Sequence, residues 1–490
     1  MKISWLIGFG LLTCLSVSDA TSAESTSLLA DAVKKNDLQA ARTLLDQQVD
    51  VRSAQVDGMT ALHWAVYHDD LSLVQRILAA GADVATQNRY GVSPLSIACQ
   101  NGSSAIVKLL LDAGAEPNEK LHGGETPLMT ASRTGQVGPV LELLARGAEV
   151  NATERKGQTA IMWAAADGHV AVVDALIEAG ADFRTPVASG FTPFFFAVRE
   201  GRIQVVERMI DAGIDVNEPL ETEKSTGSGP RPGISPLNLA VENGHLDLAE
   251  KLLEVGADPN AKGSGYTALH AITWVRKPMR GDGDPSPIGS GKLSSLDFVR
   301  KLVKYGADVN ARHTKKNAGG SHLNRAEATP FVLAAETADV PLLQMLLELG
   351  ADPMLANADD STPLLAACGV GVLGNGDDSA GTEDEVIETV SLLLDLGADI
   401  NAVDKAGNSA MHGAAYQSWT KVVAFLSEKG ADVDVWNRKN QRGWTPLLIA
   451  EGHRPGNFRP SPKTVIAIKQ AMRASGIEPP TAKALKTKPK

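Results

Sequence analysis

Three histidines occur in closely similar surroundings and are the first candidates for chemistry. His63, His270 and His412 each stand three positions after a Thr or Ser, in short segments rich in Ala. Imidazole is a common metal ligand and general base, and three histidines can hold a catalytic zinc ion. Such a site requires all three rings to reach one point, at about 2 Å from the metal. Whether they meet depends on the elements that carry them.

An acidic segment at 374–385 is the second candidate, because calcium prefers carboxylate oxygens. Counted from Asn375, however, the sixth position is not Gly and the twelfth is not Glu, so the EF-hand spacing fails. The tripeptide Arg280–Asp282 matches an adhesion motif, but matches of this length arise often by chance. The sequence has no phosphate loop, dinucleotide fingerprint, zinc-protease motif or nucleophile elbow. We therefore expect no catalytic residue, no cofactor and no metal, in a chain that is not an enzyme.

A repeat sets the elements that carry these residues. The pattern Gly-x-Thr/Ser-Pro/Ala, followed by an apolar residue, recurs along the chain, and its first five glycines, from Gly58 to Gly190, are each 33 residues apart. A second motif, Gly-Ala-Asp or a close variant, closes nearly every unit, first at Gly81 and last at Gly430. Two independent motifs at a fixed period indicate a repeat protein, in which each unit contacts only its neighbours.

Each unit is expected to contain two short helices. Thr or Ser before Pro is a preferred N-cap, and Pro is tolerated at the first helical position because that amide has no helical partner. The first helix is expected, for example, at Pro94–Asn101, and the second then carries Val107, Leu109 and Leu110. The Gly of Gly-Ala-Asp ends the second helix in a left-handed conformation. Neither helix can bury its apolar face alone, so the units must stack.

These units resemble ankyrin repeats over about residues 27–476. The matching segments are Thr60-Ala61-Leu62-His63, Ala164-Ala165, Gly168-His169, Val172-Val173 and Gly180-Ala181-Asp182. The resemblance implies an all-α repeat solenoid of β-turn–helix–helix units stacked in a curved array. It also implies that the motif histidine is structural and hydrogen-bonds between neighbouring units. Because distant units do not meet, the three candidate histidines are not expected to share a metal ion.

The spacing of the motifs also predicts the organisation of the chain. The first unit lacks the Gly-x-Thr opening and the last has a degraded second half, so both are interpreted as caps. The expected segments are a signal peptide at 1–23, an N-terminal capping repeat at 27–56, about ten repeats at 57–442 with insertions at 218–232, 276–291, 312–325 and 371–383, a C-terminal capping repeat at 443–477 and a disordered basic tail at 478–490. Two insertions extend the turns before first helices and two interrupt helix–helix turns, so loops are expected to project from both edges. These loops either serve binding or reflect neutral drift, since surface insertions cost little.

Composition limits the classes of partner. The chain of 490 residues has a net charge of −11, which disfavours nucleic acid, because phosphate contacts need clustered Lys and Arg. Hydrophobic residues make up 43% but aromatic residues only 4%, so the core must be built mainly of aliphatic side chains. Cys99 and Cys368 each replace an expected Ala on a first helix, which predicts two buried thiols too far apart for a disulfide.

The N-terminus has the features of a secretory signal peptide. Lys2 precedes an uncharged stretch, and cleavage is expected after Ala23. An uncleaved anchor is one alternative, and a lipoprotein with Cys14 as the modified residue is another, although Thr13 is unusual before such a cysteine. No later segment has about 18 consecutive apolar residues, so no integral membrane segment is expected after signal removal. We expect a periplasmic or secreted, monomeric protein.

The resemblance places partner contacts on the concave face, made of the turns and first helices. Exposed aromatic residues and arginines are the usual hot spots of interfaces. The candidate residues are Tyr67, His68, Tyr90, Arg133, Phe191, Arg199, Tyr266, Trp274, Tyr416 and Trp444. The alternative is that these rings pack against adjacent turns. The predicted function is an exported scaffold or adaptor for a protein partner. An enzyme or enzyme-activating subunit with a site among the insertions, or a host-directed effector, remains as an alternative.

Overall fold

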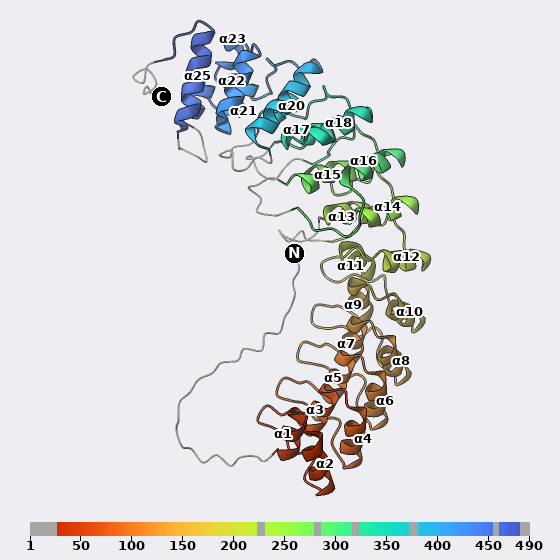
Figure 1. The fold of residues 1–490 in the computed structure, drawn as a ribbon. Helices are drawn as coiled ribbons and strands as arrows, with labels where there is room; N and C mark the ends of the chain where they lie inside the picture. Colours follow the sequence, from red (N-terminus) through yellow and green to blue (C-terminus); the bar gives the residue numbers. More distant parts are fainter. Residues whose placement is uncertain are drawn as a thin grey trace, which may run out of the picture. The chain divides into compact units, whose positions relative to one another are not determined.

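The computed structural model describes residues 27–222, 231–278, 286–315, 323–371, 381–453 and 460–480. Within these ranges the chain is helical, with one isolated antiparallel bridge between Val403 and Ser409. It divides into an N-terminal unit, Met1–Glu149, and a C-terminal unit, Val150–Lys490, which we treat separately. Figure 1 shows that both are built from stacked pairs of short helices, which confirms the predicted all-α repeat solenoid.

The N-terminal unit contains four helix pairs among its described residues. Its helices are α1 (Leu28–Lys34), α2 (Leu38–Asp46), α3 (Ala61–Tyr67), α4 (Leu71–Ala79), α5 (Pro94–Asn101), α6 (Ser104–Asp112), α7 (Pro127–Thr134) and α8 (Val137–Ala145). The first helices pack on one another in the order α1, α3, α5 and α7, while α4, α6 and α8 form a second layer. The predicted helix at Pro94–Asn101 is confirmed as α5.

The C-terminal unit continues the same two-layer pattern. Its helices are α9 (Ala160–Asp167), α10 (Val170–Glu178), α11 (Pro193–Arg199), α12 (Ile203–Asp211), α13 (Pro236–Glu242), α14 (Leu246–Glu254), α15 (Ala268–Arg276), α16 (Ser295–Lys304), α17 (Pro330–Glu336), α18 (Val340–Glu348), α19 (Pro363–Ala367), α20 (Glu383–Asp395), α21 (Ala410–Tyr416), α22 (Thr420–Glu428), α23 (Val433–Trp436), α24 (Pro446–Ala450) and α25 (Pro462–Ala474). The short helix α23, between the last two pairs, was not expected from the repeat pattern.

Each first helix begins at its predicted N-cap. The hydroxyl of Ser93 accepts a hydrogen bond from the Ser96 amide at 3.0 Å, with Pro94 at the first helical position. The hydroxyls of Thr126 and Thr329 accept in the same way from the amides three residues ahead. Such a cap satisfies one of the amides that the first helical turn leaves without a partner.

The turn before each first helix, which we call the finger, reverses the chain at its glycine. At Gly91 the backbone has φ of +78°, and the Asn88 amide donates across the turn to the Val92 carbonyl at 3.0 Å. A Cβ atom at this position would lie 2.9 Å from the His122 ring. The two fingers that lack glycine keep the left-handed conformation, because Glu327 has φ of +60° and Asp360 has φ of +58°.

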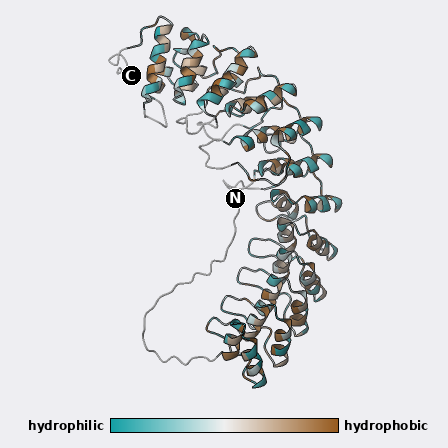
Figure 2. Ribbon diagram, in the orientation of Figure 1, coloured by the Kyte–Doolittle hydropathy of each residue, from teal (hydrophilic) through white to brown (hydrophobic). Residues whose placement is uncertain are grey.

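The core of each unit lies between the helix pairs. Hydrophobic and hydrophilic residues alternate around the helices (Figure 2), so each helix turns an apolar side towards its neighbours. Leu95 and Ala98 of α5 and Val107 and Leu110 of α6 are fully buried, as expected for two short helices that share one core. Cys99 and Cys368 are also fully buried, which confirms their predicted positions on the inner side of first helices.

Several predicted segments lie outside the described residues. They include the signal peptide at 1–23, the tripeptide Arg280–Asp282, most of the tail at 478–490 and the central part of each insertion. The described end of the 276–291 insertion contacts the preceding repeat. The Ser290 hydroxyl lies 2.9 Å from His245 Nδ1, and the Ser290 amide donates to the same nitrogen at 3.1 Å. The amides of Lys292 and Leu293 donate to the Asp247 carboxylate at 3.0 and 2.8 Å. Inserted residues therefore lengthen the contact between repeats.

Candidate partner-binding surface

The motif histidines are structural. The Nδ1 atom of His63 accepts from the Thr60 amide at 3.2 Å, while its Nε2–H donates to the carbonyl of Val92 in the next finger at 3.1 Å. His270 donates in the same way to the Ala328 carbonyl, and His412 donates to that of Arg438. Each ring thus links the start of its own helix to the following finger, which confirms the role that the resemblance implied.

Burial keeps these rings neutral. It lowers the pKa of His270 to about 3 and that of His412 to about 4, and it lowers the pKa of His63 as well. The cause is desolvation, since a charged imidazolium inside the stack would lose its water. Both nitrogens of each ring are already occupied by protein groups, so none is available to a metal ion. In the part of the chain that the structure describes, no cluster of His, Cys, Asp and Glu could hold one.

The N-terminal unit exposes aromatic side chains on its first helices and fingers. Tyr67, the last residue of α3, is 59% exposed, and Tyr90, in the finger before α5, is also 59% exposed. The Tyr67 ring contacts Trp64 at 5.6 Å between centroids and the half-buried His68 ring at 5.4 Å. The guanidinium of Arg89 lies 4.9 Å from the Tyr90 ring centroid. The predicted exposure is confirmed for Tyr67 and Tyr90.

The remaining candidate of this unit, Arg133, is exposed near the end of α7. The N-terminal unit thus carries two aromatic groups on its first-helix side: Trp64, Tyr67 and His68 at α3, and Arg89 and Tyr90 in the next finger. We refer to the two groups jointly as the Tyr67–Tyr90 surface. Tyrosine and arginine are enriched where proteins bind one another, because they bury much area at low conformational cost.

Three candidates of the C-terminal unit are buried, so their predicted exposure was wrong. Phe191 is 3% exposed because its ring packs against Phe195 and Phe196. Tyr266 is 1% exposed, and its hydroxyl donates to Glu242 of α13. The third residue, Tyr416, is 4% exposed in α21, between α19 and α24. These positions face solvent only where the adjacent repeat leaves room, and the repeat pattern does not contain that information.

Two other candidates, Arg199 and Trp444, are half-buried and take part in cation–aromatic pairs. The guanidinium of Arg199 lies 5.1 Å from the Phe191 centroid and forms an ion pair with Glu200 at 2.9 Å. Trp444 lies next to Arg442, whose guanidinium carbon is 5.9 Å from the ring centroid. Pairs of this kind are weakly attractive.

Trp274 belongs to a larger cluster in the C-terminal unit. Its ring lies 5.1 Å from that of Tyr266 and packs against a buried group that includes Leu323 and Val332. The Tyr266 ring also stacks on His313 at 5.9 Å. This cluster joins a finger, a first helix and both described ends of the 312–325 insertion. Tyr266 and Trp274 are both candidate residues, but nothing in the sequence indicates that their rings touch.

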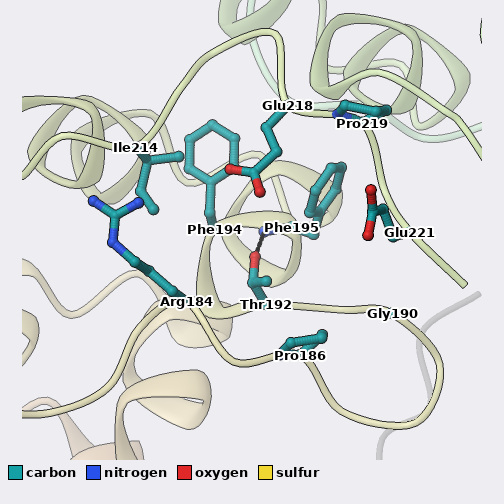
Figure 3. Close-up of a pocket in the computed structure, with 10 residues that line it drawn as sticks. All are labelled: Arg184, Pro186, Gly190, Thr192, Phe194, Phe195, Ile214, Glu218, Pro219 and Glu221. Carbon is teal, nitrogen blue, oxygen red and sulfur yellow. Dashed lines mark hydrogen bonds between the residues drawn. The ribbon is translucent and has the colours of Figure 1, made fainter.

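A small pocket lies between two fingers of the C-terminal unit, on the side of α11 (Figure 3). Phe194, Phe195, Arg184 and Ile214 line it, and the Glu218 side chain lies between the two phenylalanine rings in this view. The volume of about 160 Å³ is below the range of 300–1,000 Å³ typical of small-molecule sites. It can take one side chain of a partner, not a cofactor. The only signal for it in the sequence is the run of three phenylalanines.

An ion-pair network ties together three repeats near the 276–291 insertion. Arg276 holds the nearly buried Asp339 through two hydrogen bonds of 2.8 and 3.0 Å. The ammonium of Lys277 donates to Glu385 at 2.9 Å, in the pair that follows α17 and α18. Glu385 also caps α20, where its carboxylate accepts from the Thr382 amide at 2.8 Å. This acidic residue, once a candidate calcium ligand, therefore has a structural role.

The comparisons with known proteins agree with this geometry. The family profile described as ankyrin repeats in three copies matches residues 5–88, 29–121, 66–154, 128–219 and 380–457, which together cover more than half of the chain. A profile for a single ankyrin repeat matches residues 233–264. The chain belongs to the ankyrin-repeat family. Ankyrin repeats are typically scaffolds for protein–protein interaction. None of the helices in the described ranges is long and apolar enough to span a membrane.

Similar curated proteins match only parts of the chain. Human ankyrin repeat and SOCS box protein 6 is 31% identical over 194 residues, which are 39% of this chain and 36% of that protein. The putative ankyrin repeat protein L271 of Acanthamoeba polyphaga mimivirus is 31% identical over 97 residues, 20% of this chain and 12% of its own. The chain thus spans about a third or less of these relatives. The solved ankyrin repeat domain of human ASB11 is 23% identical, with a TM-score of 0.42, and covers 54% of this chain and 100% of its own.

Proposed function

We propose that this chain is an exported scaffold that binds a protein partner through its fingers and first helices. The observation that carries the proposal is the Tyr67–Tyr90 surface. Two tyrosines, each 59% exposed, stand on this side of the N-terminal unit in a chain whose aromatic content is only 4%. Large rings exposed to water gain hydrophobic free energy when a partner covers them.

The surface has the layout of a binding site. The ring of Trp64 is anchored by its Nε1–H, which donates to Gln55 at 2.9 Å, and Lys34 lies 5.0 Å from that ring. The rings of Trp64 and Tyr67 meet edge to face, which limits their motion. Because anchored side chains lose little entropy on binding, such a surface is suited to tight association.

Chemical crosslinking in intact cells, followed by affinity purification and mass spectrometry, tests the proposal. The double variant Tyr67→Ala, Tyr90→Ala should reduce recovery of the partner at least about tenfold, as expected when interface hot spots are removed. Tyr305→Ala is the matched control, because this tyrosine is 38% exposed at the end of the outer helix α16. Full recovery with the double variant, or an equal loss with the control, would reject this surface as the site.

Export is the second part of the proposal, and it is supported by the N-terminal sequence alone. The mature protein should begin at Glu24, after cleavage behind Ala23. N-terminal sequencing of the protein purified from its natural cell, together with fractionation, gives the answer. A protein that retains Met1 and stays in the cytoplasmic fraction would contradict export, while the binding surface would remain a separate question.

A further inference from the structure

Two arginines flank an aromatic pair in the C-terminal unit. The guanidinium carbon of Arg231 lies 5.1 Å from the Tyr266 ring centroid, and that of Arg325 lies 5.2 Å from the Trp274 centroid. The two rings contact each other at 5.1 Å, with an angle of 77° between their planes. These four side chains form a continuous set of contacts, cation to ring to ring to cation. We call them the Arg–aromatic cluster.

The two cations come from the irregular parts of the chain. Arg231 closes the 218–232 insertion and Arg325 closes the 312–325 insertion. Tyr266 and Trp274 belong to the repeat between them, in the finger and in α15 respectively. The two insertions that lengthen fingers therefore converge, at their described ends, on one aromatic pair. Stacking places these three successive fingers side by side, and each lengthened finger brings a cation to the repeat between them.

Neither guanidinium has a carboxylate partner within ion-pair distance among the described residues. The contrast with Arg276 is clear, since that side chain holds Asp339 with two hydrogen bonds and also donates to Ser295. The Nε–H of Arg325 is buried and has no hydrogen-bond acceptor. A buried donor without a partner is unfavourable, and a planar guanidinium is shaped to bind a carboxylate through two parallel hydrogen bonds. Arg231 is exposed and Arg325 is half-buried. The terminal N–H groups of the two guanidiniums, and not the buried Nε–H, are therefore the donors that a partner can reach.

The local charge is positive, although the whole chain carries a net charge of −11. The exposed Lys315 stands with both arginines close to His313, and burial together with these three charges lowers the pKa of His313 to about 4. The acid in contact with the cluster is Glu242, whose carboxylate accepts from the Tyr266 hydroxyl and whose pKa is raised by burial. Three cations thus face one carboxylate that is already hydrogen-bonded.

We propose that the Arg–aromatic cluster binds an acidic segment of a partner polypeptide. One carboxylate of the segment pairs with Arg231 and another with Arg325, while an apolar side chain between them packs on the half-buried Trp274 ring. This inference rests on the proposed function and specifies the chemistry of the partner. A short segment with two carboxylates experiences only the local positive field, whereas the overall negative charge repels a long polyanion such as nucleic acid.

Fluorescence anisotropy with the full chain and a labelled peptide tests the proposal. The probe is a dodecapeptide of Glu, Leu and Gly, and its matched control has Gln in place of every Glu. The acidic peptide should bind at least about tenfold more tightly, and the difference should shrink at high salt. The double variant Arg231→Gln, Arg325→Gln should remove that preference, whereas Arg231→Lys, Arg325→Lys should retain part of it, because the charges remain. Arg300→Gln, at an exposed arginine of α16, should bind as the unmodified chain does.

Equal affinity for the two peptides overturns the proposal, as does full binding by the double glutamine variant with an unchanged circular dichroism spectrum. Displacement of the acidic peptide by inorganic phosphate or oligothymidylate, at lower concentration than by unlabelled acidic peptide, also overturns it in favour of a phosphate site. If the crosslinked partner depends on Tyr67 and Tyr90 but the peptide does not bind, only the cluster proposal fails. If the peptide binds through the arginines and no partner is found, the Tyr67–Tyr90 surface fails instead.

Discussion

Tyr67 of the N-terminal unit and Trp274 of the C-terminal unit occupy the same place in their repeats. Each stands seven residues after the N-cap threonine and four residues after the motif histidine. Tyr67 is 59% exposed, whereas Trp274 is half-buried between the Tyr266 ring and the guanidinium of Arg325. The repeat pattern therefore determines the backbone position of a residue within its repeat. The segments packed around that position determine whether the side chain is exposed to solvent.

The same comparison explains what the insertions change and what they leave intact. Asn151 donates to the Gly180 carbonyl across 29 residues of chain, and Asn260 donates to the Gly306 carbonyl across 46 residues. The stacking bond is the same although the second repeat contains an insertion. By contrast, Lys277 reaches Glu385, 108 residues ahead and two helix pairs away. The insertion at Lys277 thus adds a contact beyond the neighbouring repeat, and the regular stacking bonds stay the same. The period alone predicts contacts between neighbouring repeats only.

The largest loss of stability is expected when the buried ion pair between Arg276 and Asp339 is removed. Arg276→Ala leaves Asp339, whose side chain is 4% exposed, without its cation, and should destabilise the C-terminal unit by about 3–5 kcal/mol. Urea unfolding followed by circular dichroism measures the loss. Arg300→Ala is the control, because its pair with Asp297 is exposed and should contribute far less to the free energy of unfolding. Equal losses for Arg276→Ala and Arg300→Ala would show that the buried ion pair does not stabilise the unit more than an exposed one.

The next largest difference in the free energy of unfolding is expected between alanine variants at the two equivalent aromatic positions, Trp274 and Tyr67. Trp274→Ala should cost about 2–3 kcal/mol, because it removes a ring that packs on Leu323 and Val332. Tyr67→Ala should change the free energy of unfolding by no more than about 0.5 kcal/mol, since an exposed ring has little to lose. Both are measured by urea unfolding. Similar costs for the two variants would show that exposure does not separate these positions.

The stability of the C-terminal unit at low pH should depend on the buried His270. The pKa of His270 is about 3 in the folded chain and 6.5 in the unfolded chain, so the unfolded state takes up a proton first as the pH falls. Its contribution is complete above pH 6.5 and is lost progressively between pH 6.5 and about 3, at up to about 1.4 kcal/mol per pH unit. Stability measured from pH 7 downwards should therefore fall less steeply in His270→Asn.

His63→Asn provides the counterpart in the N-terminal unit. The pKa of His63 is also lowered by burial, so this variant should flatten the acid limb in the same direction. A steeper fall of stability in either variant than in the unmodified chain, as the pH is lowered, would contradict the sign of these shifts.

The smallest expected difference is between two stacking asparagines, one in a regular repeat and one in a repeat with an insertion. Asn151→Ala and Asn260→Ala each remove a bond to a glycine carbonyl and a bond from the amide of Asp182 or Asp308. Both should cost about 1 kcal/mol, and the two values should agree, because the bonds are the same despite the different chain lengths that they span. Urea midpoints compare them directly. A clearly larger loss at Asn260 would indicate that the insertion makes its repeat depend more on this bond.

The sequence by itself determined the repeat and its caps, because these depend on residues that are close in the chain or one repeat apart. The hydroxyl of Ser93 accepts from an amide three residues ahead, and the ring of His63 reaches only the next finger. Thr-Pro and Gly-Ala-Asp therefore placed helix starts and ends correctly, and the buried Cys99 and Cys368 followed from the same pattern.

Only the tertiary structure decided which aromatic rings face solvent and which charges meet. Tyr266 was expected at the surface, but it is buried because Glu242 binds its hydroxyl and His313 stacks on its ring. The meeting of Arg231 and Arg325 around one aromatic pair depends on the paths of two insertions, and no period in the sequence encodes those paths. The physical reason is distance along the chain: local bonds are specified by neighbouring residues, whereas side-chain burial depends on whatever the fold brings alongside.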